Sequence, residues 1–235
     1  MKYRIRKSED DLIALFSKRM PFSEHLDKWE DEALPDKYDQ NFFEYRGQPT
    51  REEFAKAAEY QKKKGADFIK LEGREPLSDR FDLEESVTLT MMLQGEDKNW
   101  TTNPGLLFRK PSVKEVEELD VKHYASLYGE DFSRRNVRRQ YEKLTYVGAY
   151  LDGMLVGSCY YFCRDGLTCI DGLIVDGSYR KRHVATSLIA YIRCLFPDSI
   201  LYLHAEEDDS PKEMYERMGF ETVDKLYEYM GTGIR

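Results

Sequence analysis

The second half of the chain switches repeatedly between strand-like and helix-like spacing of its apolar residues. Residues 173–175 form an apolar run typical of a buried strand, and apolar residues recur at three- and four-residue spacing over 184–195. Pro197 ends that segment. The pattern predicts a strand, a turn over 176–180 and then a helix. The start of such a helix presents unpaired backbone N–H groups at the positive end of the helix dipole, an arrangement that favours binding of an anion such as phosphate.

The first hundred residues carry patterns of both element types. We expect helical pieces over 8–32 that break at Pro21, because Leu12, Leu15 and Phe16 give the first piece an apolar side. A helix over 50–64 is predicted from the capping-box spacing of its first residues and a glycine at its end. Strands are predicted over 41–47, 67–73 and 86–95.

A polar stretch over 96–106 contains Asn103-Pro104-Gly105, a turn signal, and suggests a boundary. We therefore predict two domains, 1–102 and 103–235. In the second, Ser112 and Glu115 have capping-box spacing at the start of a helix, and a basic helix follows over 133–143. Asp152-Gly153 predicts a hairpin within 145–163. Strands are also predicted over 106–110, 167–175 and 199–205, with a last strand from residue 220.

Composition narrows the functional classes. The chain of 235 residues is 41% hydrophobic and 34% charged, as in soluble globular proteins, and its net charge of −8 argues against general nucleic-acid binding. No run reaches the length of a membrane span, and the first residues lack the apolar region of a signal peptide. We expect a cytoplasmic protein with no membrane contact. The four cysteines lack metal-binding spacing, which favours reduced, buried thiols and no metal site.

The turn after residue 175 resembles motif A of the GNAT acyltransferases, in which R/Q-x-x-G-x-G/A surrounds the pyrophosphate of coenzyme A. Here the motif stands as 180–185, with His183 at the usual first glycine. If His183 keeps a helical φ angle, its side chain can be tolerated. The resemblance implies cofactor binding through the turn: Arg180, Lys181, Arg182, His183, Val184, Ala185 and Thr186.

A second stretch resembles GNAT motif B, Asn-x-x-Ala-x-x-Leu-Tyr-x-x-x-Gly-Phe. Asp208 stands at its Asn position, Pro211 at its Ala position, and Met214-Tyr215 and Gly219-Phe220 match. Ser210 is predicted to cap the helix that carries these residues. Two motifs in the right order, separated by a predicted strand, are more specific than either alone. The resemblance covers 106–230.

The resemblance implies an α/β (α+β) fold, with a mixed, mostly antiparallel sheet that is flanked by helices and splayed between its fourth and fifth strands. A smaller α/β region precedes it. That region is either a degenerate GNAT-like repeat or unrelated, and its aromatic residues either line an acceptor pocket or belong to the core. Function must come from the site.

The resemblance also implies the reaction: direct attack of an amine on the thioester of acetyl-CoA in a ternary complex. The fourth strand would pair with the pantetheine arm through the backbone of Leu173 and Val175. Strand alternation would place Asp171 on the same side, as the base that accepts the amine proton. Glu206 and His204 are rival bases, and Asp171 could equally be a structural cap or an arginine's partner.

Tyr215 holds the position where the family presents a phenol to the coenzyme A sulfur; as a helix residue between two methionines it could instead be core. Two functions follow. The first is an acetyl-CoA-dependent N-acyltransferase acting on a primary amine of a small molecule or protein. The second is a non-catalytic module that binds or senses coenzyme A. The sequence does not identify the acceptor or the oligomeric state.

Overall fold

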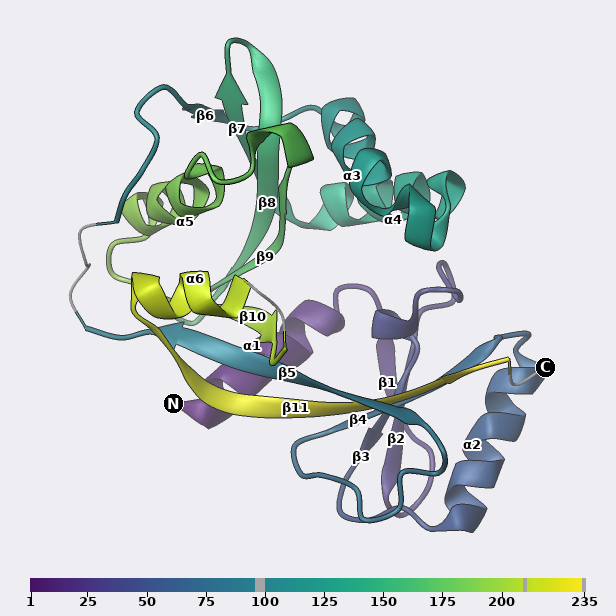
Figure 1. Cartoon of the computed structure of the whole chain (residues 1–235). Helices are drawn as coiled ribbons and strands as arrows, with labels where there is room; N and C mark the ends of the chain where they lie inside the picture. The colour runs from purple at the N-terminus through teal and green to yellow at the C-terminus, as the bar shows by residue number, and fades with distance from the viewer. Residues whose placement is uncertain (96–99, 209–210, 234–235) are drawn as a thin grey trace. The chain divides into compact units, whose positions relative to one another are not determined.

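A computed structural model describes residues 1–95, 100–208 and 211–233 (Figure 1). The chain forms two compact units, each made of segments distant in sequence. The first unit contains Met1–Thr90, Ala205–Lys212 and Thr222–Arg235, and the second contains Met91–His204 and Glu213–Glu221. The units differ from the predicted ranges 1–102 and 103–235 in three segments: 91–102 lies in the second unit, and 205–212 and 222–235 lie in the first.

The first unit is a sheet with one helix on each face. Its strands follow the order β1-β2-β3-β4-β11-β5, and β3 pairs with β4 in parallel whereas β1–β2, β2–β3 and β4–β11 are antiparallel. The elements are α1 (Lys2–Ile13), β1 (Lys18–Pro21), β2 (Leu26–Glu30), η1 (Tyr38–Gln40), β3 (Phe43–Tyr45), α2 (Arg51–Lys63), β4 (Phe68–Gly73), β5 (Glu84–Leu93) and β11 (Phe220–Thr232).

One face of this sheet is apolar and is covered by α2. Phe43, Leu71 and Tyr229 of the sheet pack with Ala57 of α2 in one buried cluster. The cluster explains why residues distant in sequence form one unit: Tyr229, on the last strand, is fully buried among residues of the first hundred.

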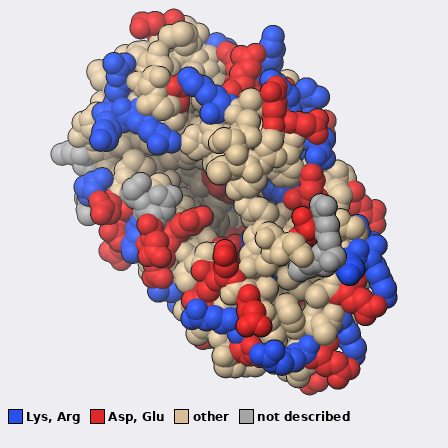
Figure 2. All heavy atoms as spheres, turned by 45° about the vertical axis from the view of Figure 1, so that its right-hand side comes forward, with Lys and Arg blue, Asp and Glu red and all other residues tan. Residues whose placement is uncertain are grey.

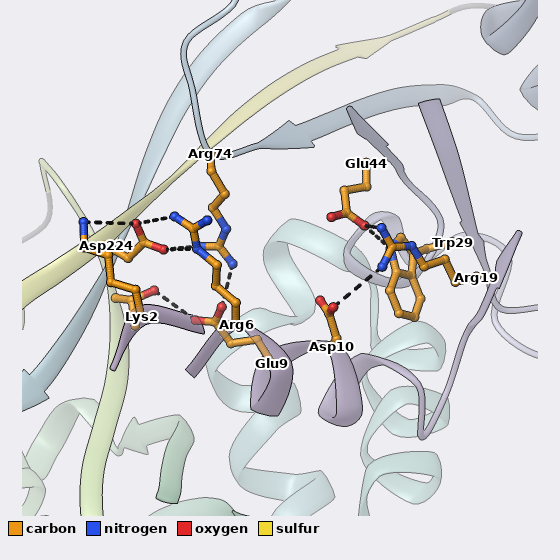
Figure 3. Close-up of polar contacts among 10 residues, drawn as sticks. Lys2, Arg6, Glu9, Asp10, Arg19, Trp29, Glu44, Arg74 and Asp224 are labelled. Atoms are coloured by element: carbon orange, nitrogen blue, oxygen red, sulfur yellow. Dashed lines mark hydrogen bonds and ion pairs between the residues drawn. The ribbon is translucent and has the colours of Figure 1, made fainter. Parts of the chain in front are cut away.

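The other face is charged, and α1 is attached to it by ion pairs (Figure 3). Arg6 of α1 donates two hydrogen bonds to Asp224 of β11, at 2.6 and 2.9 Å. Arg74 donates to Glu9 of α1. Polar contacts thus attach α1 to this face, and Ile5 is the buried apolar residue of the helix.

The predicted helical pieces over 8–32 are correct only at their start. Residues 18–30 instead form the antiparallel strands β1 and β2, with Arg19 opposite Trp29. Pro21 breaks a helix but is tolerated here because β1 is the first strand in the sheet order, where one side of the strand needs no ladder partner.

The other predicted elements of the first hundred residues are confirmed. Thr50 caps α2, with both hydrogen bonds of the capping box to Glu53 present. Gly65 follows the helix with a φ of +78°, which explains the glycine there. The strands predicted over 41–47, 67–73 and 86–95 correspond to β3, β4 and β5.

The second unit is also a sheet between helices, with strand order β10-β9-β8-β7-β6. β9 and β10 are parallel, and the other neighbours are antiparallel. The elements are β6 (Leu107–Arg109), α3 (Val113–Tyr128), α4 (Glu130–Lys143), β7 (Thr145–Leu151), β8 (Met154–Arg164), β9 (Leu167–Val175), η2 (Gly177–Tyr179), α5 (Val184–Leu195), β10 (Ile200–Glu206) and α6 (Pro211–Met218).

In Figure 1, α5 lies on one side of β7–β9, and α3 and α4 lie on the other. A side chain at Gly157 of β8 would meet Val184 and Leu188 of α5, which explains the glycine at this close approach. On the opposite face, Tyr146 of β7 stacks with Tyr141 of α4 at 5.6 Å between ring centroids.

Sequence patterns predicted every helix and strand of this unit closely. Ser112 caps α3 with a complete capping box to Glu115. The predicted cap at Ser210 lies outside the described residues. The expected fold class, a mixed and largely antiparallel sheet flanked by helices, is confirmed.

Two of the four cysteines, Cys159 and Cys169, are buried, and Cys163 and Cys194 are exposed. The expectation of buried thiols therefore holds for half of them. On the face shown in Figure 2, acidic and basic side chains are interspersed with neutral ones. Among the described residues, no helix is long and apolar enough to cross a membrane.

Candidate functional site

The strand before the predicted phosphate turn contains a β-bulge. Gly172 and Leu173 of β9 lie opposite the single residue Cys159 of β8. Gly172 has a φ of +60°, and a Cβ atom there would lie 2.5 Å from the ring of Tyr160. Only glycine meets both constraints.

The bulge changes which side chains share a face. Tyr160 lies opposite Asp171, and Gly157 lies opposite Val175. Because positions 160 and 157 are three residues apart on β8, the Tyr160 side chain and a Cβ at Gly157 point to opposite faces. Asp171 and Val175 therefore also point to opposite faces, and the alternation expected from the sequence is wrong at this point.

Asp171 is held by two hydrogen bonds. The Tyr160 hydroxyl donates to its Oδ2 at 2.9 Å, and the Gly172 N–H donates to its Oδ1 at 2.6 Å. Burial and the Asp171 carboxylate raise the pKa of Tyr160 well above its ordinary value, so the phenol keeps its proton and remains a donor. Asp171 is thus a fixed, half-buried acceptor that faces α3 and α4.

The pairing of β9 with β10 covers Leu167–Ile170 and Ile200–Leu203. Asp171 and His204 each follow directly after these paired residues. The structure therefore places the two candidate bases at the point where the parallel pairing ends. Leu173 and Val175 are half-buried and lie in the part of β9 beyond it.

A short turn connects β9 to α5. Asp176 caps the η2 segment by accepting from the Ser178 N–H at 2.9 Å, and it accepts from Lys122 of α3 at 2.6 Å. Arg180, Lys181 and Arg182 follow and are exposed. Three cationic side chains thus precede the N-terminus of α5 directly.

His183 is the N-cap residue of α5 and has left-handed backbone angles, φ +58° and ψ +23°. This is the conformation that glycine adopts most readily, so the expectation of a helical φ is wrong. No side chain of the described residues caps α5, whose first turn contains Val184, Ala185 and Thr186. Val184 is buried, and the other two are half-buried. The helix start can accept an external anion.

Tyr215 lies on α6 and is 7% exposed. Its ring packs edge-on against Phe220, with 6.1 Å between centroids. Glu206, at the end of β10, and Asp208 after it are both exposed and belong to the first unit.

Four residues of the site were missed by sequence reasoning. They are Tyr160, which orients Asp171, Gly172 at the bulge, and Asn103 and Ser187, which contact the turn. A glycine inside a strand is a known sign of a bulge, so Gly172 could have been found. Tyr160 and Asn103 carry no local signal for their contacts, because their partners Asp171 and Ser187 lie 11 and 84 positions away in sequence. Ser187 bonds the carbonyl of His183, four positions away, as a serine on any helix can.

A protein-family model matches the segment that contains most of these residues. Residues 142–222, which run from the end of α4 to the start of β11, match the family model of the acetyltransferase (GNAT) domain. This segment is thus similar to a GNAT acetyltransferase domain. The matched segment includes β9, the cationic turn, α5 and α6, so the resemblance predicted from motifs A and B is confirmed.

Solved structures extend the likeness to nearly the whole chain. A functionally unknown conserved protein from Staphylococcus epidermidis matches with a TM-score of 0.78 and 17% identity, over 92% of this chain and 94% of that chain. A GCN5-related N-acetyltransferase from Kribbella flavida matches with a TM-score of 0.63 and 13% identity, over 97% and 94%.

A tandem GNAT protein from the clavulanic acid biosynthesis pathway matches with a TM-score of 0.56 and 15% identity, over 88% of this chain and 78% of that chain. At these identities the likenesses show the fold alone. No curated protein matches the chain.

Proposed function

We propose that this protein is an acetyl-CoA-dependent N-acyltransferase that acetylates a primary amine of a small molecule or a protein. The observation that carries the proposal is the helix start at His183. There, amides without a side-chain cap follow three cationic side chains within the GNAT domain. The tandem GNAT protein and the GCN5-related N-acetyltransferase share the fold.

The residues present fit coenzyme A. The first-turn amides of α5 and the side chains of Arg180, Lys181 and Arg182 would hold the pyrophosphate, because a helix N-terminus and cationic groups both stabilise negative charge. The backbone of Leu173 and Val175, beyond the paired part of β9, would hydrogen-bond the pantetheine arm.

Acetyl-CoA supplies the acetyl group as a thioester. An ammonium acceptor would lose two protons: the first before its nitrogen attacks the carbonyl, and the second as the C–N bond forms and the C–S bond breaks. Asp171 is the proposed acceptor of the first proton, directly or through water. Tyr215 is the proposed donor of one proton to the leaving sulfur, and the second proton released from nitrogen would restore the phenol. The hydrogen bond from the Tyr160 hydroxyl fixes the orientation of the Asp171 carboxylate.

Acetyl-CoA binding tests the cofactor assignment. Cofactor at about one hundred times its dissociation constant stabilises a folded protein by about 2.7 kcal/mol, which is measurable as a thermal shift. Ala185→Glu places a carboxylate at the start of α5 and should abolish the shift. Cys194→Glu adds the same charge to an exposed position near the other end of α5 and should leave the shift intact.

Thiol release from acetyl-CoA over a panel of amines, amino acids and peptides tests catalysis. Release that requires one acceptor class identifies the substrate. Binding without release over the panel would instead favour a non-catalytic coenzyme A module. An unchanged thermal shift in Ala185→Glu would refute the cofactor site.

A further inference from the structure

Asn103, at the predicted domain boundary, contacts residues 180–186, the proposed coenzyme A turn, directly. The Asn103 N–H donates to the Ser187 hydroxyl at 2.8 Å, and that hydroxyl donates to the His183 carbonyl at 2.7 Å. The Asn103 side-chain amide donates to the Arg182 carbonyl at 3.1 Å. Two successive carbonyls of the turn are therefore held from one side by Asn103 and Ser187.

Asn103 is itself oriented. Its side-chain oxygen accepts from the Gly105 N–H at 3.0 Å, which fixes the amide group and leaves its NH₂ directed at Arg182. The Asn103-Pro104-Gly105 turn is thus a rigid support for the contact. Asn103 is half-buried and belongs to the same compact unit as the turn.

Holding these carbonyls determines where the next amides point. A peptide group is planar and trans, so its N–H points away from its own carbonyl oxygen. Fixing the carbonyls of Arg182 and His183 therefore directs the N–H groups of His183 and Val184 to the opposite side. These are the amides at the uncapped start of α5.

Residues 180–186 need this support because they contain no glycine. Lys181 and His183 both have left-handed φ angles, +61° and +58°, which are unfavourable for residues that carry a Cβ atom. A glycine would populate this conformation readily. Here the surrounding hydrogen bonds must hold it.

We propose that Asn103 is a positioning residue for the coenzyme A turn. Its side-chain amide holds the Arg182 carbonyl, and its N–H orients the Ser187 hydroxyl that holds the His183 carbonyl, so that the amides of His183 and Val184 face the pyrophosphate. The inference rests on the proposed function and adds that cofactor affinity depends on a residue outside the matched family segment of 142–222.

The test is the dissociation constant of coenzyme A, measured by calorimetry. Asn103→Ala should raise it about 10-fold, equivalent to about 1.4 kcal/mol. In a His183→Gly background the same substitution should raise it only about 3-fold or less, because glycine adopts the turn conformation without support. This rescue separates positioning from a general structural role.

Trp100→Phe is the matched control. It removes another hydrogen bond of the same segment, from the Trp100 Nε1–H to the Met218 carbonyl at 2.8 Å, and does not touch the turn. We expect it to leave the dissociation constant unchanged. Ser187→Ala removes the support from the helix side and should reproduce Asn103→Ala, which keeps the inference testable if either variant fails to fold.

The outcomes distinguish the two proposals. If the unaltered protein binds coenzyme A and Asn103→Ala binds it equally well, the positioning role is refuted and the proposed function stands. The positioning role would also be refuted if Trp100→Phe weakened coenzyme A binding as much as Asn103→Ala does. A full 10-fold loss of affinity on adding Asn103→Ala to His183→Gly would refute it as well. If the unaltered protein does not bind coenzyme A, both proposals are wrong.

Discussion

Lys28 carries a buried amine in an apolar environment, and replacing this residue with an apolar one should stabilise the protein. It lies on β2, is 1% exposed, and its Nζ has no hydrogen-bond partner among the described residues. The Nζ sits 4.6 Å from the centroid of the Phe43 ring. Burial lowers the pKa of Lys28 from 10.5 to about 7; Glu30 opposes this lowering and Lys64 adds to it.

The direction of the pH effect follows from linkage. Between pH 7 and 10.5 the unfolded chain binds a proton at Lys28 that the folded chain has largely lost, so this group makes stability rise with pH. A shift from 10.5 to about 7 lowers the free energy of unfolding by about 4 kcal/mol at pH 7 and by about 2 kcal/mol at pH 9.

Lys28→Met removes the ionisable group and keeps an unbranched side chain of similar length. The variant should exceed the unaltered protein in unfolding free energy by up to about 4 kcal/mol at pH 7, and by about 1 kcal/mol less for each pH unit up to 9. Urea unfolding at pH 7, 8 and 9, followed by circular dichroism, measures this difference.

Lys62→Met, at an exposed position of α2, is the control and should show a small, pH-independent difference. If the difference in unfolding free energy between Lys28→Met and the unaltered protein does not change between pH 7 and 9, the proposed effect of Lys28 is wrong. So would a less stable variant whose spectrum is that of the folded protein.

Three further predictions concern other residues. Tyr215→Phe should lower turnover roughly 10- to 1,000-fold with little change in acetyl-CoA affinity or melting temperature, because it removes only the proton donor; unchanged turnover on a confirmed acceptor would assign Tyr215 to the core. Gly172→Ala should destabilise the protein by about 2 kcal/mol, since it needs a left-handed φ and space taken by Tyr160; a melting temperature equal to that of the unaltered protein would contradict the bulge. Burial opposes the lowering of the Glu53 pKa to about 2, and hydrogen bonds from Thr50 and from residues 23–25 produce it. The unaltered protein should therefore lose stability as pH falls from about 4.5 toward 2, and a Glu53→Gln variant that loses as much over that range would exclude Glu53 as the cause.

Sequence patterns predicted the second unit well because its signals are local. The capping box at Ser112, the hairpin at Asp152-Gly153 and the helical spacing over 184–195 each act within a few residues. The region 18–30 failed because its strands depend on partners elsewhere: β2 pairs with β3, which lies beyond the η1 segment. A proline that ends helices also suits an edge strand, and only the sheet order decides between them.

The candidate site divides in the same way. The match of residues 180–185 to motif A predicted the cationic turn, because positive residues before a helix start can be recognised in the sequence. It predicted neither the backbone angles of His183 nor the contacts of Asn103, since both are set by the surrounding structure. The face of Asp171 was predicted wrongly because one extra residue in β9 reverses the alternation beyond it.

The two units contain the same arrangement of a strand, a helix and a parallel strand, and they differ at the helix start. In β9–α5–β10 no described side chain caps α5, and cationic residues precede it.

In β3–α2–β4, the Glu53 carboxylate accepts hydrogen bonds from the Thr50 N–H and hydroxyl, the Ser23 hydroxyl and the His25 N–H. The Glu53 N–H in turn donates to the Thr50 hydroxyl, so the start of α2 has its own side-chain cap and its own negative charge. We therefore expect the first unit not to bind the cofactor at α2. The sequence shows this difference. At α2, Thr-x-x-Glu supplies a carboxylate at the helix start, whereas at α5, Arg-Lys-Arg-His supplies only neutral or cationic side chains.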